Sequence, residues 1–450
     1  RTEIGMTNTR DTAPLVLGTE KIGKLLMQYA IPAIIAMTAS SLYNMVDSIF
    51  IGHGVGPLAI AGLAITFPFM NLAAAFGSLV GVGASTLVAI KLGQKDKESA
   101  THVLGNVVML NGIIGLVFMT VALLFLDPIL LFFGASPSAR EYMQAVLAGN
   151  LVTHIYMGLN EVLRASGYPQ KAMAATLTAV IVNCGLDALF IMGFGWGIRG
   201  AALATITAQI IALGFELHHF SRKKSFLHFQ KGIFGLKRQI VGGMLAIGLS
   251  PFLMNLCACF VVILINKSLK TYGGDLAIGA YGIVNRIVFL FIMIVMGFNQ
   301  GMQPIAGYNF GARLFDRLIQ VLKYTVFCGV AVTTVGFLAG QIFPRSLICL
   351  FTSDETLTNI AVEGLRIVLI FFPVVGFQMV TSSFFQSIGM AKKAIFLSLT
   401  RQLLFLIPSL LVFPSIWGTV GVWMSMPVAD AIATIVAACM LRWQLKHLKT

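Results

Sequence analysis

Two aspartates lie inside long apolar segments of this chain, where a charged side chain is costly. Asp47 lies five residues before Gly52, which ends one apolar run, and Asp187 lies seven residues before Phe194, which ends another. Because each helical residue advances by about 1.5 Å, the two carboxylates are expected at similar depths in a membrane. An ionisable group at such a depth is a functional candidate by default. The pair therefore predicts a site that handles protons or cations.

Four further polar side chains are expected at the same level. Three of them lie three or four residues before one of the aspartates and so lie close to its carboxylate on a helix. The fourth lies at a comparable depth in the next apolar run. The four are Tyr43, Asn44, Asn183 and Thr205.

Such a collection of oxygen atoms suits two kinds of chemistry. Two nearby carboxylates in a low-dielectric medium cannot both ionise cheaply, so one is expected to carry a proton near physiological pH. The same oxygens could instead coordinate Na⁺, a hard cation that prefers oxygen ligands. The predicted ligands of such an ion are Asp47, Asn183, Asp187 and Thr205. A structural alternative is a polar network that only holds helices together; we expect a cation-coupling site, with H⁺ and Na⁺ both open.

The segments that hold these residues are typical of a membrane protein. Of the 450 residues, 57% are hydrophobic and 11% are charged, against roughly 45–50% and about 25% in soluble globular proteins. This composition excludes an ordinary soluble enzyme, a disordered protein and a disulfide scaffold. Apolar runs of about 20 residues predict twelve transmembrane helices. The expected spans are 25–52, 58–90, 101–126, 141–163, 172–194, 200–221, 240–266, 276–308, 318–342, 357–388, 394–414 and 421–442.

The basic residues are distributed unevenly about these spans. The chain has 31 Lys and Arg against 17 Asp and Glu, for a net charge of +14. Of the 31, twenty-three lie at the termini and in every second loop, five lie in the opposite loops, and three lie within spans. This bias places both termini and the central loop in the cytoplasm. It also explains the net charge without nucleic acid, so no nucleic-acid partner is expected.

The sequence repeats at an offset near 220 residues. Gly83 corresponds to Gly301 at an offset of 218, and Gly200 corresponds to Gly421 at 221. We therefore expect an all-α membrane protein with twelve transmembrane helices in two pseudo-symmetric six-helix lobes, residues 1–229 and 230–450. Six spans in each half mean that both halves enter the membrane from the same side. A pseudo-two-fold axis along the membrane normal is then expected, as in many transporters.

Other ionisable residues within the spans are expected to be structural. Two pairs should form ion pairs: Glu363 with Arg366, which lie three residues apart, and Arg401 with Asp430 on consecutive spans. His154 is expected to form a helix–helix hydrogen bond rather than relay protons.

Glu161 and Glu216 lie near cytoplasmic span ends, where they should reach water or loop bases. Arg286 has no evident acidic partner in its half, so it should either neutralise a substrate or bind a backbone carbonyl. Abundant Met and Phe could line an adaptable wall for varied ligands. The candidate substrate contacts are Arg286, Met70, Phe289 and Gln209, and Pro32 in the first span is a candidate kink and hinge.

These residues and motifs resemble those of multidrug and toxic compound extrusion (MATE) transporters, in the wider MOP flippase superfamily. The twelve spans in two lobes match over essentially the whole chain. The matching motifs are 47–52 (DSIFIG), 83–86 (GAST), 303–312 (QPIAGYNFGA) and 350–354 (LFTSD).

The resemblance is closest to the DinF-like branch, whose coupling residues lie in the N-terminal lobe. That branch has a proline-kinked first helix with a tyrosine and an aspartate, Asn-x-x-x-Asp in the fifth helix and a threonine in the sixth. The residues here that fit this pattern are Pro32, Tyr43, Asp47, Asn183, Asp187 and Thr205. The other branch carries acids in helices 7 and 10, whereas span 7 here has none and span 10 has only Glu363.

The resemblance implies a secondary antiporter that exports cationic or amphipathic compounds in exchange for H⁺ or Na⁺, in a bacterial cytoplasmic membrane. Partners would be small-molecule drugs or organic cations and membrane lipids, no cofactor beyond the coupling ion is expected, and a monomer should suffice. One alternative is a lipid-linked saccharide or lipid flippase of the same superfamily, which would want a larger basic cavity. An integral membrane enzyme is a second alternative, but the seven histidines are scattered and form no metal motif, so no enzyme activity is expected.

Overall fold

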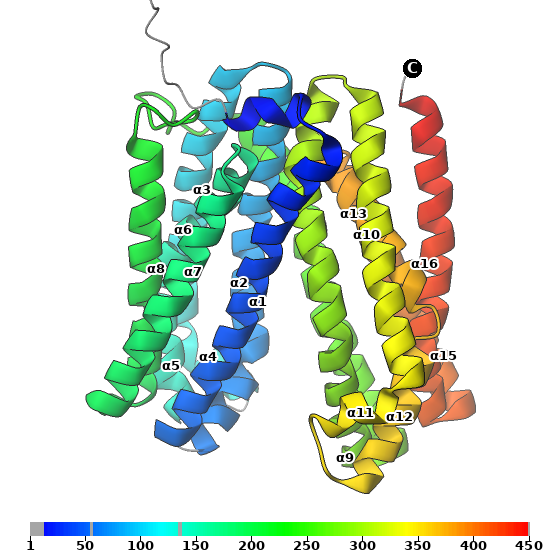
Figure 1. Cartoon of the computed structure of the whole chain (residues 1–450). Helices are drawn as coiled ribbons and strands as arrows, with labels where there is room; N and C mark the ends of the chain where they lie inside the picture. Colours follow the sequence, from blue (N-terminus) through cyan, green and yellow to red (C-terminus); the bar gives the residue numbers. More distant parts are fainter. Residues whose placement is uncertain (1–12, 55–56, 134–136, 449–450) are drawn as a thin grey trace, which may run out of the picture. The chain divides into compact units, whose positions relative to one another are not determined.

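The computed structural model describes residues 13–54, 57–133 and 137–448. Within these residues the chain is almost entirely helical, and no strand is present (Figure 1). The first half contains η1 (Ala13–Gly18), α1 (Ile22–Gly54), α2 (Pro57–Gly93), α3 (Lys97–Leu124), α4 (Leu126–Phe133), α5 (Pro137–Ala148), α6 (Asn150–Ala165), α7 (Pro169–Asp187), η2 (Ala188–Gly193) and α8 (Ile198–Ser221). The second half contains α9 (Arg238–Gly311), α10 (Phe315–Ile342), α11 (Pro344–Cys349), α12 (Glu355–Val368), α13 (Phe372–Ser387), α14 (Ala391–Leu399), η3 (Thr400–Leu406), α15 (Ile407–Trp417) and α16 (Thr419–His447).

The helices account for the apolar runs of the sequence. Nine helices among the described residues are long and apolar enough to cross a membrane, and the pair α12 and α13, bent by 57°, makes a tenth span. The fourth expected span is divided between α5 and α6. Because α6 has only 16 residues, it is about 24 Å long and falls short of a full crossing.

The helix α9 contains two of the expected spans. It runs for 74 residues but is interrupted at Gly274, whose φ of 72° and ψ of −164° are not helical. A positive φ with such a ψ is open to glycine and strained for other residues. The break divides α9 at the place where the sequence predicts the seventh span to end and the eighth to begin.

The helices form two compact units. The first comprises Arg1–Lys21, Ala39–Leu245 and Gly307–Arg313, and the second comprises Ile22–Thr38, Ala246–Ala306 and Leu314–Thr450. Two helices, α1 and α9, thus contribute residues to both units: α1 divides after Thr38, and the two ends of α9 belong to the first unit while Ala246–Ala306 belongs to the second. The expected lobe boundary between residues 229 and 230 stays a prediction.

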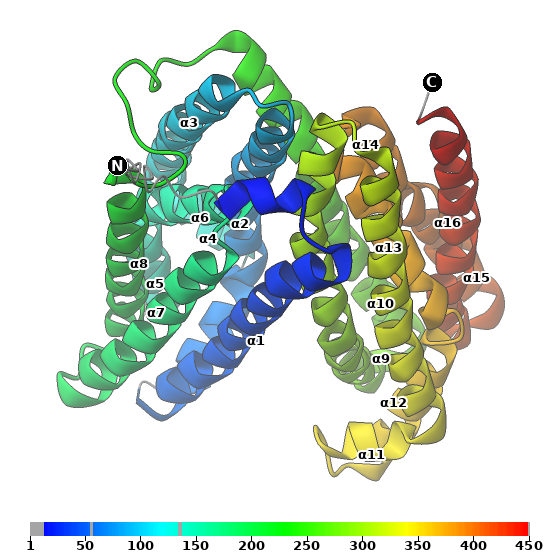
Figure 2. The ribbon, with the colours of Figure 1, turned by 45° about the horizontal axis from the view of Figure 1, so that its top comes forward.

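In the first unit, α6 is central. It packs against α2, α3, α7 and α8, while α7 and α8 pack along each other. Figure 2 shows α7 and α8 (green) side by side, with α3 (blue) on the same unit. A close approach of α3 and α6 depends on Gly158, because a methyl group there would overlap the amide of Asn111. This packing brings α7 and α8, which hold Asp187 and Thr205, into contact.

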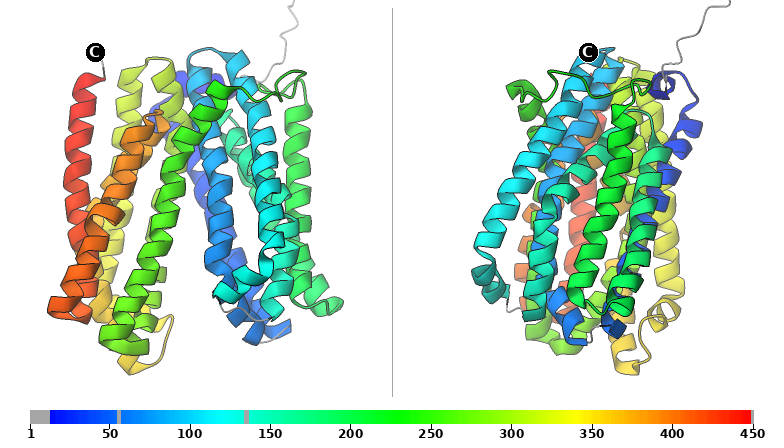
Figure 3. Two further views of the ribbon diagram at one scale, coloured as in Figure 1. Left: turned by 180° about the vertical axis from the view of Figure 1, so that it is seen from behind. Right: turned by 90° about the vertical axis from the view of Figure 1, so that its left-hand side faces the viewer.

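In the second unit, α13 packs against α10 and α16, and α16 packs along η3 and α15. The left view of Figure 3 shows α16 (red) beside the orange helices α14 to α15. The apolar core of this unit surrounds the fully buried ring of Trp423. The turn from α14 through η3 therefore faces the middle of α16.

The carboxylate of Asp96 caps the N-terminus of α3 by accepting the backbone N–H of Ser99 at 3.1 Å. Hydrogen bonding from the side chain and the backbone of Ser99 lowers the pKa of Asp96 from its usual value. Because the folded-state pKa is lowered, the cap stabilises the protein above the unfolded-state pKa and is lost as the pH falls through the folded-state pKa.

We predict that Asp96→Ala lowers stability at neutral pH by about 1 kcal/mol, since an N-cap acceptor is removed. The measurement is the melting temperature of the purified protein in detergent. Asp96→Asn is the matched control, because its amide oxygen can accept the same hydrogen bond and should retain most of the stability. An equal loss in both variants would contradict the capping role.

Candidate cation-coupling site

The carboxylates of Asp47 and Asp187 lie together in the first unit, one from α1 and one from α7. Asp187 is fully buried and interacts with both Asp47 and Tyr43. Among the described residues, neither carboxylate oxygen of Asp187 has a hydrogen bond of good geometry, and Oδ1 of Asp47 also lacks one. In the same part of the chain, no Lys or Arg forms an ion pair with either carboxylate. The structure thus places two acids side by side without a compensating positive charge.

The hydroxyl of Thr205 on α8 connects the helices that carry the two aspartates. It lies 3.3 Å from the hydroxyl of Tyr43 on α1 and accepts from Nδ2 of Asn183 on α7, also at 3.3 Å. It donates to the carbonyl of Ala201, 3.1 Å away in the preceding turn. Three helices therefore meet at one hydroxyl, and the sequence-predicted group of Tyr43, Asp47, Asn183, Asp187 and Thr205 is brought together.

The amide of Asn183 is oriented by this contact. Its nitrogen is used by Thr205, and its oxygen Oδ1 is buried without a hydrogen-bond partner in the described residues. An acceptor left in this way is costly unless a donor or a cation reaches it. Together with the two carboxylates, it provides several unsatisfied acceptor oxygens within one cluster and is suited to a small cation.

The helix geometry changes directly after Asp187. The α-helix α7 ends there and continues as the π-helical turn η2 over Ala188–Gly193. Such turns are wider than an α-helix and are frequent at functional sites. The wide turn thus lies directly beside one of the two aspartates of the site.

Tyr142 on α5 belongs to the site, and the sequence did not predict it. Its half-buried phenol lies close enough to Asp47 and Asp187 to interact with both, and its ring packs against a cluster around Ile51 and Ile191. Tyr142 lies at the outer start of the fourth expected span, 141–163. The only available signal was a tyrosine at the same end of the bundle as the aspartates.

The remaining predicted residues lie apart from this cluster or at its edge. Asn44 follows Tyr43 on α1 but is exposed, and Pro32 is buried within an α1 that continues through it. Gln209 lies one turn beyond Thr205 and is in contact with the hydroxyl of Thr153, which donates to its Oε1 at 2.5 Å.

The other three candidate substrate contacts are not gathered into one place. Met70 packs against an apolar cluster of the first unit that includes Leu126 and Leu147. Arg286 and Phe289, both in α9 of the second unit, are exposed. Arg286 forms no ion pair within the described part of the chain, as the sequence suggested.

Two of the other expected contacts are present and one is not. Arg401 and Asp430 form an ion pair, and Nε2 of His154 lies 2.9 Å from the carbonyl of Ala73, a helix–helix contact. The expected pair of Glu363 and Arg366 is wrong: both side chains are exposed and no ion pair between them exists in the described residues. Water at an exposed site offsets most of what such a pair gains.

Glu216 differs from its prediction as well. It does not reach water or a loop base but is fully buried on α8, where its Oε1 accepts from Asn160 of α6 at 3.1 Å. Glu161, by contrast, forms the expected pair with a basic residue, Arg164, at 3.1 Å. The prediction for Glu216 failed because hydropathy gives the depth of a residue but not the direction in which its helix face points.

A family model named MatE matches residues 32–189 and 247–411, which together make up well over half of the chain. The chain belongs to the MatE family. The matched segments include Asp47 and Asp187 in the first unit and most of α9 to α15 in the second.

Curated relatives in the same family cover nearly the whole chain. "Multidrug export protein MepA" of Staphylococcus aureus strain MRSA252 is 26% identical over 426 residues, covering 92% of each chain. The MepA protein of Staphylococcus haemolyticus strain JCSC1435 is 28% identical over 424 residues, again with 92% of each chain covered.

Solved structures confirm the all-helical MATE fold. An outward-facing multidrug resistance MATE family transporter of the MOP superfamily superposes with a TM-score of 0.91 at 26% identity, covering 98% of this chain and 99% of the other. A MOP superfamily transporter from Pyrococcus furiosus, described as having a binding pocket of reverse polarity, gives a TM-score of 0.90, also at 26% identity and with the same coverage. The resemblance drawn from the sequence motifs is therefore confirmed at the level of family and fold.

We predict that Thr205→Val destabilises the protein by about 1 kcal/mol, because it leaves the Tyr43 hydroxyl and the Asn183 amide without their shared partner. The melting temperature in detergent measures the effect. Thr205→Ser keeps the hydroxyl and should stay close to wild type. If Thr205→Ser were less stable than Thr205→Val, packing of the Thr205 methyl group rather than hydrogen bonding would hold the three helices together.

Proposed function

We propose that this protein is a multidrug efflux antiporter, which exports cationic or amphipathic small molecules in exchange for H⁺ or Na⁺ by alternating access. Its membership of the MatE family supports transport, and the similarity to multidrug export proteins supports the substrate class. The observation that carries the ion coupling is the contact of the buried Asp187 with the half-buried Asp47, without a positive partner among the described residues.

The physical argument for coupling is one of charge. Two unit charges about 4 Å apart repel by roughly 4 kcal/mol at an effective dielectric of about 20, against roughly 1 kcal/mol in water. Desolvation of each carboxylate adds to this repulsion. An empty, doubly ionised pair is therefore unfavourable, and a bound proton or cation relieves it.

The same groups allow either ion. A proton on one carboxyl could be shared with the other carboxylate, with the Tyr43 and Tyr142 phenols nearby. A Na⁺ ion would instead take oxygens from both carboxylates, from Oδ1 of Asn183 and from the hydroxyl of Thr205. The proposal keeps both ions, and the experiment below separates them.

Binding of the ion provides the switch in the proposed cycle. Neutralising the pair would allow the two carboxyl groups to approach and would rearrange the contacts that Thr205 makes between α1, α7 and α8. This rearrangement would weaken substrate binding in the outward-open state. By linkage, the substrate must weaken binding of the ion by the same factor.

The remaining features of the proposal concern the membrane. The bias of basic residues favours cytoplasmic termini in a bacterial cytoplasmic membrane. Pro32 lacks a backbone N–H and so interrupts the hydrogen bonding of α1. It is the proposed hinge of α1, within the part of this helix that belongs to the second unit, and a monomer suffices because one chain holds both units.

We predict that wild-type protein in proteoliposomes moves ethidium, a lipophilic cation, against its gradient when a pH or Na⁺ gradient is imposed at zero membrane potential. For one-to-one exchange of ions of equal charge, a tenfold ion gradient supports about tenfold accumulation of the probe, since both represent about 1.4 kcal/mol. Asp47→Asn and Asp187→Asn should each abolish this gradient-driven transport. Each imposed gradient is tested alone, which identifies the ion.

The matched control is Asp127→Asn, an identical change at an exposed acid whose partner is the exposed Arg140. It should transport like wild type. Unchanged transport by both Asp47→Asn and Asp187→Asn would refute the coupling site. If neither gradient drove any amphiphile in wild type, the antiporter itself would be refuted, and lipid-linked substrates of a flippase would be tried next.

A second prediction concerns linkage. Equilibrium binding of ethidium to the purified protein should weaken as H⁺ or Na⁺, whichever drives transport, is raised to saturation. A coupling of about 1–3 kcal/mol corresponds to a change of roughly 5- to 150-fold in affinity. Asp187→Asn should make the affinity independent of that ion, and an ion-dependent affinity in this variant would place the ion elsewhere.

A further inference from the structure

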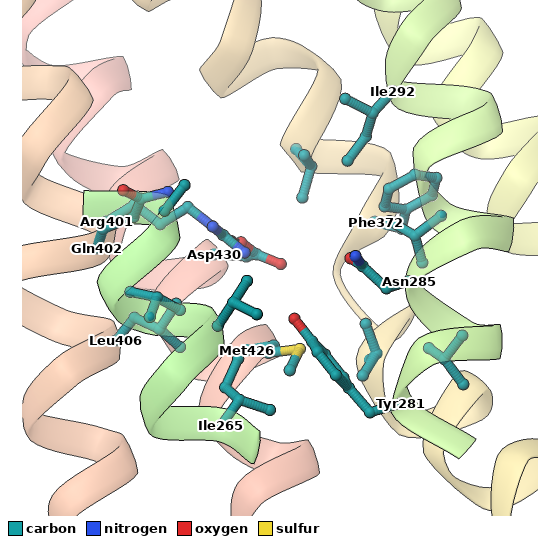
Figure 4. A pocket seen from close by; sticks show the side chains of 17 residues that line it. Ile265, Tyr281, Asn285, Ile292, Phe372, Arg401, Gln402, Leu406, Met426 and Asp430 are labelled. Carbon is teal, nitrogen blue, oxygen red and sulfur yellow. Dashed lines mark hydrogen bonds and ion pairs between the residues drawn. The ribbon is translucent and has the colours of Figure 1, made fainter. Parts of the chain in front are cut away.

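A cavity of about 190 Å³ lies within the second unit. Its walls come from both parts of α9 and from α12, α13, η3 and α16, and most of the lining side chains are apolar (Figure 4). The π-helical turn η3 contributes two successive residues, Arg401 and Gln402, to the cavity wall. A π-helical turn is wider than an α-helical one, so adjacent residues can line the same cavity. None of the residues of the proposed cation-coupling site lies in this wall.

One charged pair stands in the apolar wall. Arg401 donates from Nε to Oδ1 of Asp430. The side chain of Asp430 is only 5% exposed and that of Arg401 is 27% exposed, so the guanidinium has room to bind a second group. Figure 4 shows the carboxylate of Asp430 pointing toward the open space between α16 and α9.

Two neutral polar groups face the same space. The hydroxyl of Tyr281 and the amide of Asn285, one turn apart on α9, point into the cavity in Figure 4. Neither side chain forms a hydrogen bond within the described part of the chain. The cavity thus presents a carboxylate, a guanidinium, a phenol and a carboxamide, with free hydrogen-bonding capacity on the last two.

The charges of this wall select the charge of a ligand. The pair of Arg401 and Asp430 is neutral as a whole. A bound monocation would give this apolar wall a net positive charge, and a bound monoanion would give it a net negative charge; an uncompensated charge in such surroundings is unfavourable. A ligand with both charges can replace one ion pair by two and leave the net charge at zero.

The size and the walls limit the ligand further. An apolar cavity of about 150 Å³ holds a benzene molecule, so about 190 Å³ suits a substituted benzene rather than a drug-sized compound. The rings of Tyr281 and Phe372 and the side chains of Ile265, Ile292 and Met426 form the surrounding surface. Aromatic walls favour an aromatic ligand through offset or edge-to-face contacts.

We propose that this cavity is a binding site for a small zwitterionic amphiphile, with adjacent ammonium and carboxylate groups on an apolar, aromatic body. The ammonium binds Asp430 and the Asn285 and Tyr281 oxygens, and the carboxylate binds Arg401. The site is independent of the cation-coupling aspartates, so its occupancy does not require the proposed antiport.

The test is equilibrium binding of tritiated L-phenylalanine to the full chain in nanodiscs of zwitterionic phospholipid near neutral pH. The competitors are unlabelled L-phenylalanine, 2-phenylethylamine and 3-phenylpropionate, which share the ring and differ in charge. L-Phenylalanine should compete at a concentration at least about tenfold lower than the other two. An equal or stronger effect of the amine or the acid, or no saturable binding up to about 10 mM, would overturn the proposal.

Two variants should reverse the preference for charge. Asp430→Asn leaves the guanidinium of Arg401 without its carboxylate partner, so 3-phenylpropionate should bind this variant most tightly of the three compounds. Binding to this variant is measured with tritiated 3-phenylpropionate. Arg401→Gln leaves the carboxylate of Asp430 without its guanidinium partner, so 2-phenylethylamine should bind this variant most tightly. Binding is measured with tritiated 2-phenylethylamine. A purely structural role of the pair would weaken all three compounds alike, and that result would count against the assigned contacts.

The matched control is Glu363→Gln, an exposed acid of the second unit outside the cavity wall. It should leave the three affinities and their order unchanged. The comparison of the three compounds on wild-type protein needs no variant, so the proposal can be refuted even if Asp430→Asn or Arg401→Gln does not fold.

Discussion

Two neighbouring acids, Asp47 and Asp187, have no positive partner among the described residues of the first unit, and this is the main electrostatic constraint on the packing around them. A carboxylate in such surroundings can be stabilised by hydrogen bonds, by a cation or by a proton. Here hydrogen bonding is incomplete, since both oxygens of Asp187 lack a partner of good geometry among the described residues. The phenols of Tyr43 and Tyr142 and the amide of Asn183 are neutral dipoles and do not cancel a full charge. In the proposed coupling, positive charge that enters the site would stabilise it, and the contacts of Thr205 with Tyr43 on α1 and Asn183 on α7 would make that gain depend on helix position.

In the second unit, by contrast, the buried acid has a positively charged partner. Asp430 is almost as deeply buried as Asp187, but it forms an ion pair with Arg401. An ion pair of this kind is a poor coupling site for H⁺ or Na⁺, because its positive charge is already supplied by the protein. It is suited to a ligand that is itself neutral overall. The two units thus differ in whether the described residues supply a positive partner for the buried acid.

Much of this arrangement could be predicted from the sequence, and the failures share one cause. Hydropathy located the helices, because a long apolar run has few alternatives in a chain this poor in charge. Depth along a helix then brought Asp47, Asp187, Asn183 and Thr205 to one level. The contact of Arg401 with Asp430 followed from the same reasoning on consecutive antiparallel spans. What depth cannot give is the direction of a helix face. Tyr142 was missed because its depth did not show that it faces Asp47 and Asp187, and Glu216 was misjudged because its face turns toward Asn160.

The helix α1 has a special place in any account of coupling. Its residues Ile22–Thr38 belong to the second unit and those from Ala39 to the first, although it is one continuous helix. Asp47 therefore lies on a helix whose preceding part, Ile22–Thr38, belongs to the second unit. Pro32 removes one hydrogen bond from the helix ladder within the part that belongs to the second unit. A helix weakened at that point can change its path without breaking, at a cost of only a few kcal/mol. In the proposed antiport, neutralising the pair of Asp47 and Asp187 would relieve a repulsion of roughly 4 kcal/mol, which is large enough to shift a two-state equilibrium of this helix.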